Sequence, residues 1–293
     1  HGGYIMVKLI EIIYAVLAGI VQGITEWLPI SSTGHLIILD SLFNIDSLSP
    51  DFVNMFDVVI QFGSILAIVV LYFHRLNPFA PSKSKAEKKS TWSLWAKILV
   101  AAVPAGVIGV ALNDFLDETV FVDPQRNFII AAALIFYGIL FIIIERTHRK
   151  KLYRIESPED IDYKTALGVG AFQVLALIPG TSRSGSTIIG STLLGVSRTA
   201  AAEFSFFLAI PVMLGASLLK IAKFVVGADG GIASAFTAGE FIVLGVGTLV
   251  SFLVSLVAVR FLVNFVRRHS FESFGWYRIV LGIAVLVYFG LIK

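Results

Sequence analysis

Long apolar runs recur along the whole chain and constrain its fold more than any other feature. Charged residues make up only 15% of the sequence, against about a quarter in a typical soluble domain. A helix that crosses a bilayer needs about 20 mainly apolar residues. The runs that approach this length occupy residues 55–73, 97–113, 127–145, 199–224, 238–260 and 276–292. The sequence therefore predicts an all-α integral membrane protein with about six transmembrane helices.

Two further apolar stretches are interrupted. Residues 8–26 and 31–43 are separated by Pro29 and a Ser-Ser-Thr-Gly run, and residues 165–178 and 184–196 are separated in a similar way. Backbone groups without partners in hydrocarbon cost several kcal/mol each, so a break at membrane depth must line a cavity or pack against protein. We therefore expect two helix–loop–helix segments that do not simply cross the membrane.

The distribution of charge predicts the orientation. Lysine and arginine concentrate in the loops at 74–97, 146–164 and 260–278, the last of which includes Arg260 and Arg278, while the intervening loops are acidic. The positive-inside rule places basic loops in the cytoplasm. The span 199–224 already supplies the one crossing needed after the second basic loop. The interrupted stretch before it is therefore expected to be re-entrant from the cytoplasmic side.

An internal repeat extends this interpretation to the first interruption. Each copy, at about 8–145 and 165–292, consists of an interrupted segment followed by three spans, and an odd number of crossings inverts the second copy. The interpretation is an inverted-topology repeat with two re-entrant segments. The alternatives are chance similarity and a single kinked crossing over 8–38. A shift of 151 residues superposes Gly19 on Gly170, Gln22 on Gln173, Ser31 on Ser182, Gly34 on Gly185, Ile37 on Ile188 and Ile38 on Ile189.

One domain accounts for the whole sequence. We expect a single membrane domain over residues 6–293, with residues 1–5 as a non-native remnant before a start at Met6. The chain has no cysteine, which excludes disulfides, thiolate catalysis and zinc–thiolate sites.

Both breaks combine a proline turn with a hydroxyl-rich helix start. Serine and threonine cap helix N-termini, and N-termini attract anions, phosphate in particular. In an inverted repeat the two helix starts face each other, so we expect them to converge on one anion site. The hydroxyl residues expected to bind substrate there are Ser31 and Thr33 in the first break and Ser182, Ser184 and Thr187 in the second, while Ser32 of the first break is a candidate catalytic residue.

Arg183 and Glu26 are the charged residues of the two breaks. An arginine within an apolar stretch is costly and usually functional, and its planar fork suits phosphate oxygens. Its alternative role is that of a structural partner of Glu26. Gln22 lies one helical turn before Glu26, so both face the break. Together they could hold Mg²⁺ or Ca²⁺, with substrate phosphate completing the shell, or they could hold the arginine.

His35 lies one turn into the helix that follows the first break, three residues after Ser32. A histidine there can act as a general base, a general acid or a nucleophile. The repeat superposes Ser32 on Arg183 and His35 on Ser186. The first half would therefore carry the reacting groups and the second half the positive charge.

Four stretches resemble the BacA-type undecaprenyl-pyrophosphate phosphatases, and the similarity extends over nearly the whole chain. Residues 22–35 read QGITEWLPISSTGH and resemble the family's glutamate-rich motif, although Gln22 replaces the glutamate that often begins it. Residues 179–187 read PGTSRSGST and resemble its arginine-serine motif. The other two stretches are FDVVIQFGSILA (56–67) and GVSRTAAAEFSFFLAIP (195–211).

The resemblance implies an activity: hydrolysis of the polyprenyl pyrophosphate carrier lipid of bacterial cell-wall synthesis, with an association with bacitracin resistance. It also implies active-site roles for Gln22, Glu26, Ser31, Ser32, His35 and Arg183, with Ser182, Ser184 and Thr187 in the matching second motif. Either Ser32 or His35 would attack the terminal phosphorus or activate the water that does, and the other would manage the proton. The expected location is the bacterial plasma membrane, with the site facing outward. The expected partners are the lipid substrate, membrane lipids and a homodimer, without nucleic acid. The alternative function is a transporter or flippase of a polyprenyl phosphate lipid, because broken inverted repeats are typical of transporters.

Overall fold

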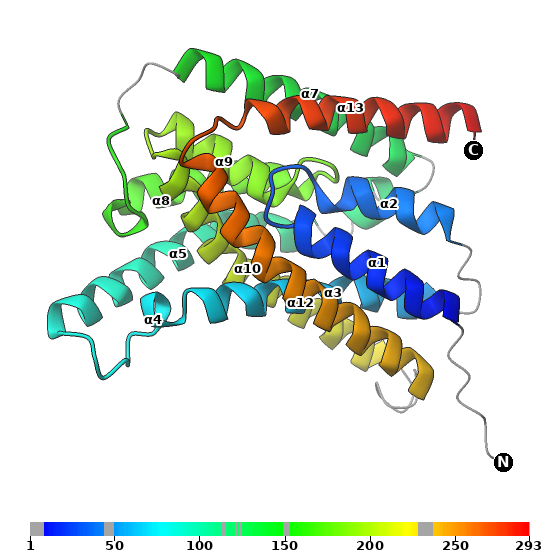
Figure 1. The fold of residues 1–293 in the computed structure, drawn as a ribbon, viewed down its shortest axis with the longest axis horizontal. Coiled ribbons are helices and arrows are strands. Elements are labelled where there is room, and N and C mark those ends of the chain that lie inside the picture. The colour runs from blue at the N-terminus through cyan, green and yellow to red at the C-terminus, as the bar shows by residue number, and fades with distance from the viewer. Residues whose placement is uncertain are drawn as a thin grey trace.

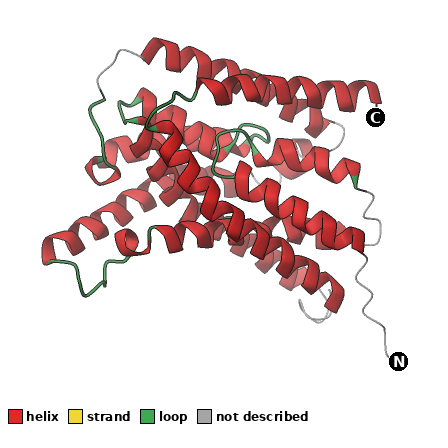
Figure 2. Cartoon of the chain, in the orientation of Figure 1, coloured by secondary structure: helices red, strands yellow, loops and turns green. Residues whose placement is uncertain are grey.

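The structure, a computed structural model, describes residues 9–43, 50–112, 115–120, 122, 125–148, 153–227 and 237–292, so the expected start at Met6 lies outside it. The described part is almost entirely helical (Figure 2). Outside its helices, the β-type pairing within these residues is one isolated parallel bridge between Ile155 and Val196. The predicted all-α class is confirmed for this part of the chain.

The helices form a bundle of antiparallel and crossing neighbours (Figure 1). α7 and α13 lie side by side, α1 and α3 both pack on α12, and α5 packs on α8. In chain order the elements are α1 (Leu9–Thr25), α2 (Ser32–Leu42), α3 (Pro50–Leu71), α4 (Phe73–Leu76), α5 (Lys85–Ala111), η1 (Leu116–Val120), α7 (Gln125–His148), η2 (Pro158–Asp160), α8 (Tyr163–Gln173), η3 (Val174–Leu177), α9 (Arg183–Leu193), α10 (Arg198–Gly227), α12 (Ala238–Val266), α13 (Glu272–Val287) and η4 (Tyr288–Ile292).

Five of these helices are long and apolar enough to cross a membrane: α5, α7, α10, α12 and α13 together with η4. They correspond to five of the six expected spans. The remaining span, 55–73, corresponds to α3, whose apolar part Met55–Leu71 is shorter than the other five. The chain is therefore a multi-pass membrane protein by the length and composition of its helices. Many large apolar side chains remain exposed on the outside of the bundle, as lipid-facing surfaces require.

Glycines allow the closest helix contacts. A Cβ built on Gly138 of α7 would lie 2.7 Å from the carbonyl oxygen of Gly275 in α13, and one on Gly275 would lie 2.7 Å from the carbonyl oxygen of Gly138. Small residues at such crossings let two backbones approach, which is how helices associate where no hydrophobic force drives them together. This pair therefore sets the position of α13, which carries residues of the site described below.

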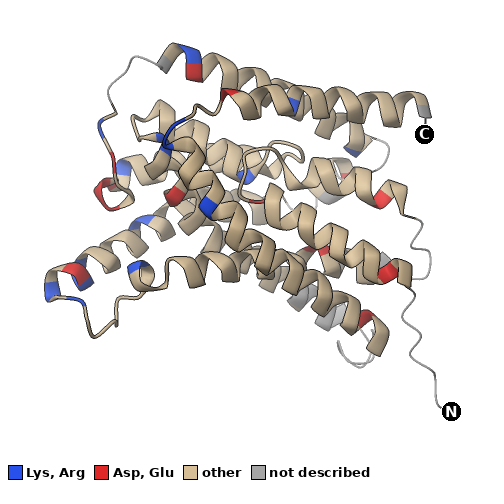
Figure 3. Cartoon of the chain, in the orientation of Figure 1, with Lys and Arg blue, Asp and Glu red and all other residues tan. Residues whose placement is uncertain are grey.

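Lysine and arginine residues gather at the end of the bundle formed by α4 and the start of α5, whereas acidic residues lie at the opposite ends of α1, α2 and α12 (Figure 3). One assignment within this pattern is wrong. Arg260 and Arg278 were expected in a basic loop, but α12 extends to Val266 and α13 begins at Glu272, so both lie inside helices. Arg278 is also fully buried. Its guanidinium is accommodated there because backbone carbonyl groups at the two breaks accept its hydrogen bonds.

Candidate active site

The two expected breaks exist and have the same local geometry. Ser31 is the N-cap of α2 and Ser182 is the N-cap of α9, and each hydroxyl accepts a hydrogen bond from the backbone N–H three residues later. Both serines have positive φ, 73° and 71°, which is uncommon outside glycine. Such a conformation costs about 1–3 kcal/mol and occurs mainly where a site requires it. These two helix starts are therefore held in matching, strained turns.

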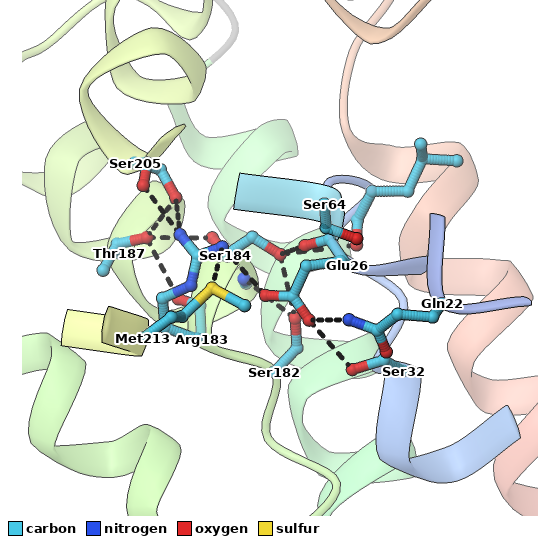
Figure 4. Close-up of polar contacts among 12 residues, drawn as sticks. Gln22, Glu26, Ser32, Ser64, Ser182, Arg183, Ser184, Thr187, Ser205 and Met213 are labelled. Carbon is cyan, nitrogen blue, oxygen red and sulfur yellow. Dashed lines mark hydrogen bonds and ion pairs between the residues drawn. The ribbon is translucent and has the colours of Figure 1, made fainter. Parts of the chain in front are cut away.

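A buried ion pair joins the breaks. The Nη2 of Arg183 lies 3.0 Å from Oε1 of Glu26, and the two side chains are only 12% and 9% exposed. The other carboxylate oxygen, Oε2, accepts hydrogen bonds from Nε2 of Gln22 (3.1 Å) and from the hydroxyl of Ser32 (3.2 Å). Figure 4 shows these groups pointing toward one another. Four of the residues singled out in the sequence thus meet at one carboxylate.

Arg183 is held from a second direction by α10. Its Nη1 donates to the carbonyl oxygen (2.7 Å) and the hydroxyl (3.2 Å) of Ser205, and that hydroxyl also lies 2.7 Å from the hydroxyl of Thr187 (Figure 4). The guanidinium carbon lies 5.7 Å from the centre of the Trp27 ring, a distance suited to a cation–π contact. The guanidinium plane is therefore fixed before any ligand binds.

The hydroxyls of the second break also cross to the first. The hydroxyl of Ser184 donates to the carbonyl oxygens of Glu26 (3.2 Å) and Leu28 (3.4 Å), and it lies 3.1 Å from the hydroxyl of Ser182. Thr33 is partly exposed in the first turn of α2. The expected hydroxyl groups thus lie around the junction of the two breaks, where Glu26 meets Arg183. Ser184 and Thr187 are buried, however, and their hydroxyl groups form hydrogen bonds with other groups of the protein.

His35 lies in α2 as expected, but its ring nitrogens bond to Ser31 and Tyr277 rather than to Glu26, Ser32 or Arg183. Its Nδ1 is 2.7 Å from the carbonyl oxygen of Ser31, and its Nε2 is 2.7 Å from the hydroxyl of Tyr277 in α13. The two rings are nearly parallel, with an interplanar angle of 9°. His35 therefore joins the first break to α13.

Arg278 bridges the two breaks from the same helix. Its Nη1 donates to the carbonyl oxygen of Pro29 (3.1 Å), and its Nη2 donates to the carbonyl oxygens of Gly180 (2.8 Å) and Thr181 (2.9 Å). The residue is 0% exposed. Arg183 and Arg278 together thus place two guanidinium groups at the junction against the one carboxylate of Glu26. This excess of positive charge, added to two helix N-termini, favours an anion.

Comparison with known proteins identifies the family. The family model described as "Bacitracin resistance protein BacA" matches residues 15–284. The chain belongs to the BacA family. An undecaprenyl-diphosphatase of Enterococcus faecalis is 54% identical to this chain over 275 residues, which is 94% of the chain and 96% of the relative. An undecaprenyl-diphosphatase of Lactiplantibacillus plantarum is 50% identical over 284 residues, 97% of the chain and 100% of the relative.

Three contributors to this BacA-family site were not anticipated: Ser205, Tyr277 and Arg278. Ser205 lies in the stretch GVSRTAAAEFSFFLAIP, where it is a lone hydroxyl among aromatic residues. Tyr277 and Arg278 lie at the start of the last apolar run, where a tyrosine and an arginine resemble ordinary interfacial residues. The available signal was the position of Arg278 inside an apolar helix, which is costly without buried partners.

The residues expected to bind a divalent cation can be tested against the contacts. The described residues contain no group of three or more His, Cys, Asp or Glu side chains that could hold a metal ion. The buried Oε1 of Gln22, however, has no hydrogen-bond partner. One free amide oxygen and one carboxylate suit Mg²⁺ only when water and substrate phosphate supply the remaining ligands. Gln22 and Glu26 therefore offer only part of the ligand set that Mg²⁺ or Ca²⁺ requires.

Proposed function

We propose that this protein is an undecaprenyl-diphosphate phosphatase, which hydrolyses the lipid pyrophosphate to the lipid monophosphate and inorganic phosphate and so confers bacitracin resistance. The observation that carries the proposal is the Glu26–Arg183 pair at the junction of the two breaks. Membership of the BacA family and relatives named undecaprenyl-diphosphatase support the substrate. A non-catalytic carrier has no evident need for a carboxylate that holds a serine hydroxyl beside an arginine.

The charge of the junction supports binding of the pyrophosphate. We expect the terminal phosphate to bind at Arg183, where it takes over hydrogen bonds now made to Glu26. The N-termini of α2 and α9 add backbone N–H groups and partial positive charge. Phosphoryl transfer depends mainly on such positioning and charge stabilisation.

The contact between Ser32 and Glu26 supports a division of roles. The Ser32 hydroxyl already donates to the Glu26 carboxylate, so the carboxylate can accept the Ser32 proton as the serine oxygen attacks the terminal phosphorus. The bond from phosphorus to the bridging oxygen breaks, and the lipid monophosphate leaves. Water then hydrolyses the phosphoserine and releases inorganic phosphate. The two ring nitrogens of His35 are already bonded to Ser31 and Tyr277, so His35 stabilises this arrangement through those contacts.

Gln22 and Glu26 are the residues that we propose to hold a divalent cation, Mg²⁺ or Ca²⁺. When bound, the cation would neutralise phosphate charge beside the arginine. The free Oε1 of Gln22 supports this role, since a buried amide oxygen without a partner is unfavourable by itself.

The inverted repeat and the orientation are also part of the proposal. The matching φ angles and caps of Ser31 and Ser182, 151 positions apart, support two equivalent re-entrant segments. The gathering of lysine and arginine residues at one end of the bundle supports a cytoplasmic position for that end in the plasma membrane. The first break then opens outward, so hydrolysis occurs at the outer face. The homodimer stays a prediction.

Release of phosphate from undecaprenyl pyrophosphate by the purified protein tests the function, with and without a chelator. We expect chelator-sensitive release by the wild type and loss of at least a hundredfold for Arg183→Ala. Arg146→Ala is the matched control, because the Arg146 side chain is 61% exposed and pairs with Glu272 rather than with a residue of either break. Absence of release by the wild type would contradict the proposal and direct attention to lipid transport in vesicles.

A further inference from the structure

The two ring nitrogens of His35 have different roles, which their partners define. Nδ1 faces the carbonyl oxygen of Ser31, and a carbonyl oxygen only accepts, so Nδ1 carries the proton. In the neutral ring Nε2 is then the acceptor, and the hydroxyl of Tyr277 donates to it. The lone pair of His35 is therefore occupied by Tyr277 rather than directed at Glu26 or Arg183.

The carbonyl group that accepts the hydrogen bond from Nδ1–H belongs to the peptide between Ser31 and Ser32. Ser31 is the strained cap with φ of 73°, and Ser32 is the hydroxyl that donates to Glu26. A rotation of this peptide would therefore move the Ser32 hydroxyl. Two hydrogen bonds thus run from Tyr277 to His35 and from His35 to the carbonyl group of Ser31. The peptide between Ser31 and Ser32 connects them to a third hydrogen bond, from the Ser32 hydroxyl to Glu26.

α13 fixes the other end of this chain of contacts. Arg278, next to Tyr277, is bound to carbonyl oxygens in both breaks, so the backbone of Tyr277 cannot shift without disturbing them. The ring of Tyr277 also stacks against the imidazole, with centroids 5.6 Å apart. The second break lacks this device: at the position equivalent to His35, Ser186 donates to the carbonyl oxygen of Arg183 in its own turn.

We propose that Tyr277 is a positioning residue that acts through His35 on the Ser31–Ser32 peptide. Tyr277 selects the imidazole tautomer in which Nδ1 is the donor, and that donor holds the peptide in the conformation that aims the Ser32 hydroxyl at Glu26. His35 accordingly acts in the reaction by orientation and not as the nucleophile. This inference rests on the proposed phosphatase activity.

Tyr277→Phe keeps the ring and removes only the hydroxyl. We expect kcat for phosphate release from undecaprenyl pyrophosphate to fall about tenfold, with KM and the melting temperature in detergent nearly unchanged. Tyr163→Phe is the matched control, because Tyr163 is a similarly exposed tyrosine at the start of α8, 52% exposed against 46% for Tyr277. A Tyr277→Phe protein with the kcat of the wild type would overturn the proposal.

Substitutions of His35 separate orientation from chemistry. The amide nitrogen of asparagine can replace Nδ1 as the donor to Ser31, whereas nothing in asparagine replaces the Nε2 lone pair. We expect His35→Asn to keep at least ten times the kcat of His35→Ala, and Tyr277→Phe to cause no further loss in the His35→Ala background. Equal kcat for His35→Asn and His35→Ala, or losses that multiply in the double variant, would contradict a positioning role.

A measurement that does not depend on activity distinguishes this inference from the proposed function. Nuclear magnetic resonance of ¹⁵N-labelled histidine in the full chain, with His35 assigned by its absence in His35→Asn, reports which ring nitrogen is protonated. We expect the Nδ1–H tautomer in the wild type and a mixture in Tyr277→Phe. The other tautomer in the wild type would refute the inference, even for an active enzyme. An inactive wild type with the expected tautomer would instead refute only the phosphatase.

Discussion

The guanidinium of Arg183 donates a hydrogen bond over 3.0 Å to the carboxylate of Glu26, a residue 157 positions away in the sequence. The contact brings together the N-terminus of α9 and the residue that follows α1, and it is nearly closed to solvent. Removing one partner of such a pair strands a buried charge, which is more costly than the pair is favourable. Activity and folding should therefore respond together to changes at this contact.

Glu26→Gln should abolish activity and lower stability. The amide still accepts and donates hydrogen bonds, but it neither neutralises Arg183 nor takes a proton from Ser32. We expect phosphate release to fall at least a hundredfold and the free energy of unfolding to fall by about 3 kcal/mol. Phosphate assays and thermal unfolding in detergent measure both effects. Glu272→Gln, at a more exposed ion pair, should retain most of the activity and stability, and equal losses in both variants would contradict the assignment.

Arg278→Met should destabilise both breaks. Methionine leaves the carbonyl oxygens of Pro29, Gly180 and Thr181 buried without their donor, and each unsatisfied group costs about 1–3 kcal/mol. We expect a melting temperature at least 10 °C lower and little remaining phosphatase activity. Arg278→Lys, which restores one charged donor, should recover part of the stability. Arg146→Met is the surface control, and a melting temperature for Arg278→Met as high as for this control would exclude a bridging role.

The local features of the site could be predicted from the sequence. Proline and clustered hydroxyls mark both breaks because turn and cap preferences depend on a few neighbouring residues. The repeat hypothesis predicted that the two breaks would converge, and the structure brings Glu26 and Arg183 together, which is the pairing considered as the alternative role of the arginine. Most of the long helices could be predicted from apolar length alone.

The contributions of α10 and α13 could not be predicted in the same way. These helices carry three residues that reach the site only because α10 and α13 pack against the breaks: Ser205, Tyr277 and Arg278. A local sequence pattern does not predict which helices are neighbours. An arginine near the end of an apolar run also has an ordinary explanation, because long basic side chains extend to the membrane surface. For the same reason the partner of His35 was not identified, and its nitrogens were left available for catalysis.

Acid should weaken a contact at the basic end of the bundle. Burial raises the pKa of Glu159, but hydrogen bonds from Arg75 and Ser157 outweigh it and lower the pKa from 4.5 to about 2. The carboxylate therefore stabilises the fold above its unfolded pKa, and this stability is lost as the pH falls from about 4.5 through about 2. We expect Glu159→Gln to lower the free energy of unfolding by about 1–2 kcal/mol at pH 7, allowing for partial exposure. The difference from wild type should shrink as the pH falls below 4.

Thermal unfolding across this pH range tests the prediction. Glu156→Gln is the matched control, because Glu156 is an exposed carboxylate of the same loop. We expect its melting temperature to follow that of the wild type at every pH. A difference between Glu159→Gln and wild type that persists unchanged to pH 3 would show that the carboxylate charge is not responsible.

Gly275→Ala should displace α13 and, with it, the two site residues that follow. The added Cβ would lie 2.7 Å from the carbonyl oxygen of Gly138 and 2.8 Å from Ile142, closer than packed atoms tolerate, and the backbone oxygen cannot rotate away. Tyr277 and Arg278 lie within one turn of this crossing, so a shift of α13 moves their hydrogen bonds to His35 and to the breaks. We expect a loss of at least tenfold in kcat together with a lower melting temperature.

Gly245→Ala in α12 is the matched control, because a Cβ there meets nothing within 4 Å. The alanine also replaces a conformationally flexible glycine inside a helix. It should leave kcat unchanged and raise the melting temperature slightly. Equal behaviour of the two variants would show that the approach of α7 and α13 does not position the site.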